Sequence, residues 1–266
     1  MQATQKITAR TFTIDGPPGK IFVDDGGKGN IPALFVHSFG GNPHHWSNQL
    51  EHLRKNRRAV AFDLRGHGES ATPPNNDYTV SSLCDDIAAL TSELDLDRCV
   101  LVGHSMGGSA AISFAANYPE KVAGLVVCGT PGRSPAESAK QIIASLESDQ
   151  YEAVMEKYMS KLLEKALPQT SEMERAGMKK IPKEASVEII RSIFNYDPLP
   201  DFRKYKGPKL IISMANEEQA HSLHESFPDV PYQTVAGTSH WIQLDKPTQF
   251  NKILDAFLQE MDRNQL

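Results

Sequence analysis

Short apolar runs alternate with longer amphipathic runs over most of the chain. The apolar runs are rich in β-branched residues and lie near residues 11–15, 20–25, 32–38, 58–64, 99–105, 122–129, 209–214 and 232–237. Between most of them, apolar residues recur at the three- and four-residue spacing of amphipathic helices. This pattern predicts an α/β fold with a mostly parallel eight-stranded sheet flanked by helices, whose first two strands form an antiparallel hairpin.

The segment from residue 133 to 200 interrupts this alternation. It has no strand-like run, and Met, Ile and Leu recur there at helical spacing. We interpret residues 133–200 as an inserted helical cap, with residues 1–132 and 201–266 as the two parts of one core. Most of the apolar stripe of the cap is expected to pack on the core. Met155 and Met159 are our candidates for side chains that face the cleft.

The composition limits the classes of partner. The 266 residues include 28 Lys and Arg against 33 Asp and Glu, a net charge of −5, and the basic residues form no block that could bind phosphates. The N-terminal residues lack the apolar core of a signal peptide, and no run of 18 apolar residues occurs. We therefore expect a cytoplasmic monomer or homodimer that binds neither nucleic acid nor membranes.

The cysteines and the paired histidines indicate no metal or cofactor. Cys84, Cys99 and Cys128 are odd in number and lie in strand-like or amphipathic runs, which is typical of reduced core thiols. His221 and His224 are three residues apart, and the sequence near them offers no third ligand. We expect a solvated helix face there rather than a metal site.

A G-x-S-x-G sequence, from Gly103 to Gly107, follows an apolar run directly and precedes a run of small residues. In a strand–turn–helix setting, the central residue of this motif is held in a strained turn that projects its side chain away from the sheet. Small neighbours leave the space that such a turn requires. We predict that Ser105 is a nucleophile; an ordinary tight turn with a buried serine is the alternative.

A serine hydroxyl is a weak nucleophile at neutral pH and needs a base to remove its proton. His240 lies between the last strand-like run and the final helix, as expected for a chain order of nucleophile, acid and base. Six of the other eight histidines precede Ser105, and His221 and His224 lie in a helix-like stretch. His240 is therefore the predicted catalytic base.

Acyl transfer also requires two backbone N–H groups that stabilise an oxyanion. One is expected from Met106, the residue after the nucleophile. The other is expected from the glycine-containing turn at 37–41, where we choose Phe39. A plain loop between strand and helix is the alternative for that turn.

Four segments together resemble the α/β-hydrolase superfamily, and the resemblance covers essentially the whole chain. Residues 37–41 (HSFGG) are similar to its HG-x-G oxyanion loop, with Ser38 in place of the usual glycine. Residues 63–70 (DLRGHGES) resemble its D-x-R-G-x-G-x-S turn, 103–108 (GHSMGG) its nucleophile elbow, and 240–247 (HWIQLDKP) the segment around its base. The resemblance implies the α/β-hydrolase fold and a Ser–His–acid triad.

The acid of that triad departs from the superfamily pattern, in which G-x-x-D commonly follows the seventh strand. Here the run at 208–213 is followed by Met-Ala-Asn-Glu-Glu. Counting from Pro208 places Glu217 where the aspartate would stand. The segment is shorter than usual, so Glu218 and Asn216 remain alternatives, as does a solvated glutamate in a helix-initiating loop.

The predicted function is hydrolysis of a small-molecule carboxylic ester through an acyl-enzyme on Ser105. Lactones, thioesters and the carbon–carbon bonds cleaved by meta-cleavage-product hydrolases stay open as substrates, and perhydrolase or haloperoxidase chemistry is expected at most as a side activity. The resemblance implies an aspartate nucleophile in haloalkane dehalogenases and epoxide hydrolases, so a serine argues against both. A receptor-like binding protein with vestigial turnover is the alternative class, supported by the unusual acid position. The predicted substrate contacts are Ser38, His104, Met155, Met159 and Trp241.

Overall fold

The computed structural model describes residues 9–215 and 222–263, and in this part of the chain eight strands form one sheet. Strand β2 pairs antiparallel with β1 and β4, and all other neighbouring strands are parallel. The predicted fold class and the predicted hairpin are confirmed. In their order across the sheet the strands are β1 (Ala9–Gly16), β2 (Gly19–Gly26), β4 (Arg57–Phe62), β3 (Asn30–Val36), β5 (Cys99–His104), β6 (Val122–Cys128), β7 (Lys209–Met214) and β8 (Tyr232–Val235).

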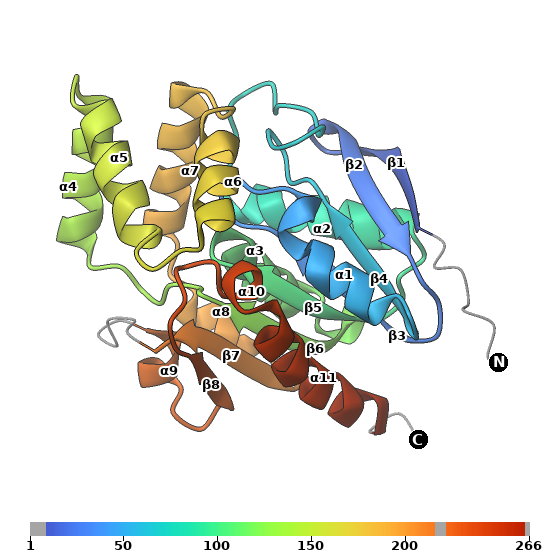
Figure 1. The fold of residues 1–266 in the computed structure, drawn as a ribbon. Coiled ribbons are helices and arrows are strands. Elements are labelled where there is room, and N and C mark those ends of the chain that lie inside the picture. The colour runs from blue at the N-terminus through green and yellow to red at the C-terminus, as the bar shows by residue number, and fades with distance from the viewer. Residues whose placement is uncertain (1–8, 216–221, 264–266) are drawn as a thin grey trace.

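Helices cover both faces of the sheet (Figure 1). Each face of the sheet has its own apolar cluster. Along β3, Leu34 and Val36 belong to one cluster, whereas Ala33 and Phe35 belong to the other. Successive side chains of a strand point to opposite faces, so a sheet covered on both faces requires a continuous apolar run. The first cluster takes side chains from α2 (Val80–Glu93), α3 (Met106–Asn117) and α8 (Leu199–Lys204), and the second from α1 (Ser47–Leu53) and α11 (Pro247–Arg263).

Short helices fill several connections. The 3-10 turns η1 (Pro43–Trp46) and η2 (Pro119–Lys121) precede α1 and β6, and α9 (Leu223–Ser226) precedes β8. The four-residue helix α10 (Ile242–Asp245) stands immediately before α11 and was not anticipated from the sequence. A single helical turn is too short to produce a periodic apolar pattern.

Between β6 and β7 the chain forms four further helices, which we call the helical insertion. They are α4 (Ala136–Glu147), α5 (Tyr151–Leu162), α6 (Pro168–Met178) and α7 (Lys183–Asn195). Figure 1 shows them grouped on the side of the molecule away from β1. Helix α6 starts at a proline, whose fixed φ and missing N–H suit the first helical turn.

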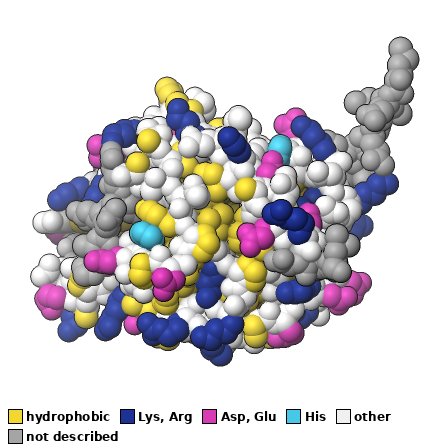
Figure 2. Space-filling model, turned by 90° about the horizontal axis from the view of Figure 1, so that it is seen from below, with side chains coloured by type: hydrophobic (Ala, Val, Ile, Leu, Met, Phe, Trp, Pro, Cys, Tyr) yellow, Lys and Arg dark blue, Asp and Glu magenta, His cyan; other side chains and the backbone are white. Residues whose placement is uncertain are grey.

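The cysteines, the surface charges and the helix lengths bear on the expectations drawn from the composition. Cys84, Cys99 and Cys128 are buried and form no disulfide, as expected of core thiols, and burial raises the pKa of Cys99 to about 12. On the face shown in Figure 2, acidic and basic side chains are interspersed. Across the described ranges, no helix combines the length and apolar character needed to cross a bilayer.

Candidate active site

Ser105 lies between the end of β5 and the first residue of α3, in a strained backbone conformation. Its φ of 52° and ψ of −116° put a non-glycine residue in the left-handed region. Two hydrogen bonds hold this turn: the Ser105 N–H donates to the Cys128 carbonyl at 2.9 Å, and the Ser105 carbonyl accepts from the Gly108 N–H at 2.9 Å. The side chain remains partly exposed and lines a cavity.

The neighbouring glycines allow this turn to pack closely. A Cβ at Gly103 would collide with the Gly107 carbonyl, and a Cβ at Gly107 would collide with the His37 carbonyl. Such contacts are closer than side-chain carbons tolerate, so both positions require glycine. The structure thus gives the physical reason for the G-x-S-x-G pattern at this place in the fold.

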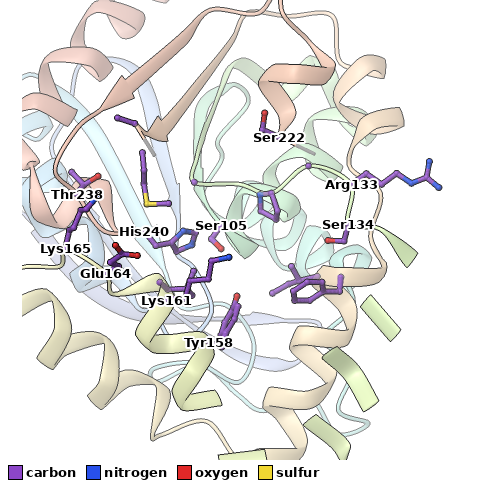
Figure 3. Close-up of a pocket in the computed structure, with 18 of the residues that line it drawn as sticks. Ser105, Arg133, Ser134, Tyr158, Lys161, Glu164, Lys165, Ser222, Thr238 and His240 are labelled. Carbon is purple, nitrogen blue, oxygen red and sulfur yellow. The ribbon is translucent and has the colours of Figure 1, made fainter. Parts of the chain in front are cut away.

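His240 follows β8 and lies beside Ser105, and both residues line the same cavity (Figure 3). Its backbone N–H donates to the carbonyl of Leu162, the last residue of α5, at 3.0 Å. Burial lowers the pKa of His240 to about 4. The imidazole is therefore uncharged at neutral pH and able to accept a proton.

His104 forms a hydrogen bond with the backbone of His240 and does not line the cavity. Its Nε2–H donates to the His240 carbonyl at 2.9 Å, and its Nδ1 accepts from the Gln243 amide at 3.3 Å. The two imidazole centroids are 4.8 Å apart, and the His104 side chain is fully buried. We therefore replace the predicted substrate contact of His104 with a role in holding the His240 backbone.

Phe39 and Met106 are the predicted oxyanion donors. Within the described residues, neither N–H donates to a protein atom. The turn that contains Phe39 is closed by a 3.0 Å hydrogen bond from the Gly41 N–H to the Ser38 carbonyl, and Gly40 adopts a φ of 74°. An oxyanion site requires backbone N–H groups that are free to donate to the substrate, and these two N–H groups have no protein acceptor among the described residues.

The predicted acid, Glu217, lies outside the described residues, as do its alternatives Glu218 and Asn216. In residues 9–215 and 222–263, no carboxylate forms a hydrogen bond or an ion pair with the His240 ring. Glu164 lines the same cavity without such a contact. The same ranges contain no cluster of three or more His, Cys, Asp or Glu that could hold a metal ion.

The cavity has a volume of about 490 Å³ and lies between the sheet and the helical insertion. The turn after β6 contributes one wall and helix α5 contributes another. Besides Ser105 and His240, its lining includes Arg133, Ser134, Tyr158, Lys161, Leu162 and Phe194. Figure 3 shows Tyr158 and Lys161 reaching toward Ser105 from the insertion.

The other four predicted substrate contacts lie elsewhere. Met159 packs with Trp241 and Leu163 in a small buried cluster between the insertion and the core. Met155 is partly buried against the first apolar cluster, and Ser38 is buried in the turn at residues 37–41. The lining of the cavity contains none of these side chains. Helical spacing predicted the apolar stripe of α5, whereas the adjacent face, with Tyr158 and Lys161, meets the cavity.

Asp245 is a buried residue at the site that the sequence analysis did not single out. Its Oδ2 accepts from the Ser239 N–H at 2.7 Å and from the Ser239 hydroxyl at 2.5 Å. Its Oδ1 accepts from the Leu167 N–H at 3.1 Å and from the Thr170 hydroxyl at 2.8 Å. Asp245 therefore connects the residue before His240 to the start of α6. The sequence offered one sign of this role, namely an acidic residue five positions after the predicted base.

Comparisons with known proteins agree with this architecture. A sequence model of the alpha/beta hydrolase fold matches residues 32–180. The sn-1-specific diacylglycerol lipase ABHD11 of Mus musculus is 30% identical over 257 residues, which cover 87% of this chain and 82% of that protein. Epoxide hydrolase 3 of Xenopus tropicalis is 27% identical, with coverage of 90% and 74%. A thermophilic esterase from Thermogutta terrifontis superimposes with a TM-score of 0.79 at 24% identity, covering 96% of this chain and 100% of that one.

Proposed function

Because the chain belongs to the α/β-hydrolase fold family, we propose that it is a serine hydrolase that cleaves a small-molecule carboxylic ester through an acyl-enzyme on Ser105. The observation that carries the proposal is the shared cavity of Ser105 and His240. There a partly exposed hydroxyl on a strained turn lies beside an imidazole whose lowered pKa leaves it uncharged. This pairing supports a nucleophile and its base.

In the proposed reaction, His240 takes the Ser105 proton as Oγ attacks the carbonyl carbon. The N–H groups of Met106 and Phe39 donate to the oxyanion of the tetrahedral intermediate. His240 then protonates the leaving alcohol, and an ester of Ser105 remains. Water, deprotonated by His240, attacks this ester and releases the acid. Glu217 is our proposal for the group that holds His240 Nδ1–H.

A carboxylic ester is favoured over an epoxide as the substrate. The mouse relative is named as a diacylglycerol lipase, and diacylglycerol is a carboxylic ester. Epoxide hydrolases of this superfamily use an aspartate nucleophile, whereas position 105 is serine. We further propose that the helical insertion acts as a cap that selects the substrate, because α5 supplies Tyr158, Lys161 and Leu162 to the cavity.

The test is covalent labelling with a fluorophosphonate probe, together with turnover of esters, lactones and thioesters of graded chain length. Ser105→Ala should lose labelling and lower ester turnover by about 10³ or more, since the nucleophile and its base act as a unit. Ser134→Ala is the matched control, because Ser134 lines the same cavity. Retained labelling in Ser105→Ala would reject Ser105 as the nucleophile. Absence of both labelling and turnover in the parent protein would favour a binding role.

A further inference from the structure

The candidate active-site cavity is lined by more basic than acidic side chains, although the chain carries a net charge of −5. Arg133, Lys161 and Lys165 line it, and Glu164 is the one acidic residue among the described lining residues. Arg133 faces Asp197 at 3.6 Å. Lys161, Lys165 and Glu164 form no ion pair with any described residue. Lys161 and Lys165 are exposed at the rim of this cavity, and neither ammonium group has an ion-pair partner in the described ranges.

Lys161 is held next to the proposed base by the backbone. It precedes Leu162, whose carbonyl accepts the His240 N–H at 3.0 Å, so the last turn of α5 is fixed to the residue that carries the imidazole. Figure 3 shows the Lys161 side chain extended into the cavity, with its amine pointing toward Ser105. An ammonium group is thereby placed where a substrate would lie.

Tyr158 adds a second donor on the same face of α5. It is three residues from Lys161, a spacing at which helical side chains are neighbours. Its hydroxyl also points toward Ser105 in Figure 3. Burial raises the pKa of Tyr158 to about 12, so the hydroxyl keeps its proton at neutral pH. No described residue accepts a hydrogen bond from it.

We infer that Lys161 and Tyr158 form a subsite for a negatively charged group, so that the ester cleaved at Ser105 carries a carboxylate. This inference rests on the function proposed above. An ammonium and a hydroxyl that both lack protein acceptors would donate charge-assisted hydrogen bonds to a carboxylate. The apolar side chains of Leu162, Ile193 and Phe194 line the same cavity and would contact the carbon chain between the carboxylate and the ester.

The experiment compares matched pairs of esters that differ in one charge. Mono-p-nitrophenyl glutarate and p-nitrophenyl pentanoate differ in the acyl part, whereas 3-acetoxybenzoate and 3-methylphenyl acetate differ in the leaving group. Lys161→Met should lower the kcat/KM ratio of charged to neutral ester by about tenfold or more in one pair. The pair that responds identifies the part of the substrate that carries the carboxylate. Lys161→Arg should retain most of the preference, and added salt should weaken it.

The matched control is Lys157→Met. Lys157 is an exposed lysine on the same helix and does not line the cavity, so its replacement removes one positive charge at a different place. Lys157→Met should leave the charged-to-neutral ratio at the parent value. Equal ratios in Lys161→Met and Lys157→Met for both pairs, with the esters still hydrolysed, would overturn the subsite and leave the proposed function standing.

A binding measurement separates the subsite from turnover. Glutarate should bind to Ser105→Ala in calorimetry, and the added Lys161→Met substitution should weaken this binding by about tenfold or more. If neither ester of any pair is hydrolysed, the proposed function fails, and glutarate binding alone decides the subsite. Binding that is absent, or unaffected by Lys161→Met, would overturn the inference.

Discussion

The Asp245 carboxylate accepts the backbone N–H of Ser239 at 2.7 Å and thereby fixes the residue that precedes His240. Its other oxygen bonds to Thr170 at the start of α6, so one buried side chain joins the base-bearing loop to the helical insertion. The Asp245 carboxylate is the acceptor in all four of its hydrogen bonds. A carboxylate, which only accepts, fits this position better than an amide.

We predict that Asp245→Asn lowers the free energy of unfolding by about 2–4 kcal/mol, because the amide NH₂ must face donors and leaves them unpaired in the interior. Urea unfolding measures the loss. Asp255→Asn is the control, since Asp255 forms a half-exposed pair with His52, and its loss should stay below about 1 kcal/mol. Equal losses in the two variants would show that Asp245 does not hold this junction.

The pH dependence of activity should report the buried state of His240. A histidine with an ordinary pKa of about 6.5 would lose its base form below neutral pH. Burial lowers the pKa of His240 to about 4, so the base form is lost only as pH falls toward that value. We predict that kcat/KM for a neutral ester is flat from about pH 6 to 8 and falls at lower pH, with a midpoint below 6.5. A midpoint above 6.5, with the fold checked by circular dichroism, would contradict this.

Glu174 on α6 and His45 on η1 form a second buried contact between the insertion and the core. His45 Nε2 lies 3.1 Å from Glu174 Oε1, and both side chains are almost completely buried. Burial, with the Asp245 carboxylate nearby, raises the pKa of Glu174 to about 9. Burial, with the neighbouring His67 and His44, lowers that of His45 to about 3. At neutral pH the carboxyl group is therefore protonated and the imidazole uncharged, so this buried contact is not an ion pair.

This contact predicts a stability difference that changes with pH. The folded-state pKa of Glu174 is raised above its ordinary value of 4.5, so its contribution is present below pH 4.5 and is lost as pH rises toward 9. Glu174→Gln keeps a side chain of similar size that cannot ionise. The melting temperature of Glu174→Gln minus that of the parent protein should therefore increase as the pH is raised from 5 to 9. Glu156→Gln, which replaces an exposed carboxylate, should show no such gain. A Glu174→Gln difference that stays constant with pH would refute the assignment.

The sheet could be predicted from the sequence because the signal is local. Apolar runs such as the one in β5 are buried on both faces, and this strand ends at His104, directly before the turn at Ser105. Local signals also placed Ser105, since a strand, a strained turn and a helix follow one another within a few residues. The start of α3 at Met106 was less clear, because glycines follow it directly.

The cavity lining could not be predicted in the same way. Helical spacing groups Met155 and Met159 into a stripe, but the orientation of α5 is set by distant contacts, such as the one between Leu162 and His240. Asp245 bonds to residues 75 and 78 positions away in the chain. No local period contains such partners, so Asp245 and Lys161 were found only in the folded structure.

The last prediction concerns the acid that orients His240. Glu217 is proposed from the sequence, by its count after β7, and it lies outside the described residues. A glutamate carries its carboxylate about 1.5 Å further from the backbone than an aspartate, the length of one carbon–carbon bond. A connection shorter than usual between β7 and α9 is compatible with that extra length. Glu164 is the alternative within the described residues, because it lines the cavity beside His240 without contacting the ring.

We predict that Glu217→Gln lowers kcat by roughly 10² to 10⁴, because an amide in place of the acid favours the wrong imidazole tautomer. Glu218→Gln and Glu164→Gln should remain near the parent value, and single-turnover hydrolysis of a p-nitrophenyl ester is the measurement. Labelling of Ser105 by fluorophosphonate should slow in Glu217→Gln in parallel with turnover, since both need His240 to take the serine proton. A large loss in Glu218→Gln or Glu164→Gln, and not in Glu217→Gln, would move the acid to that residue. Near-normal rates in all three variants would mean that none of these glutamates orients His240.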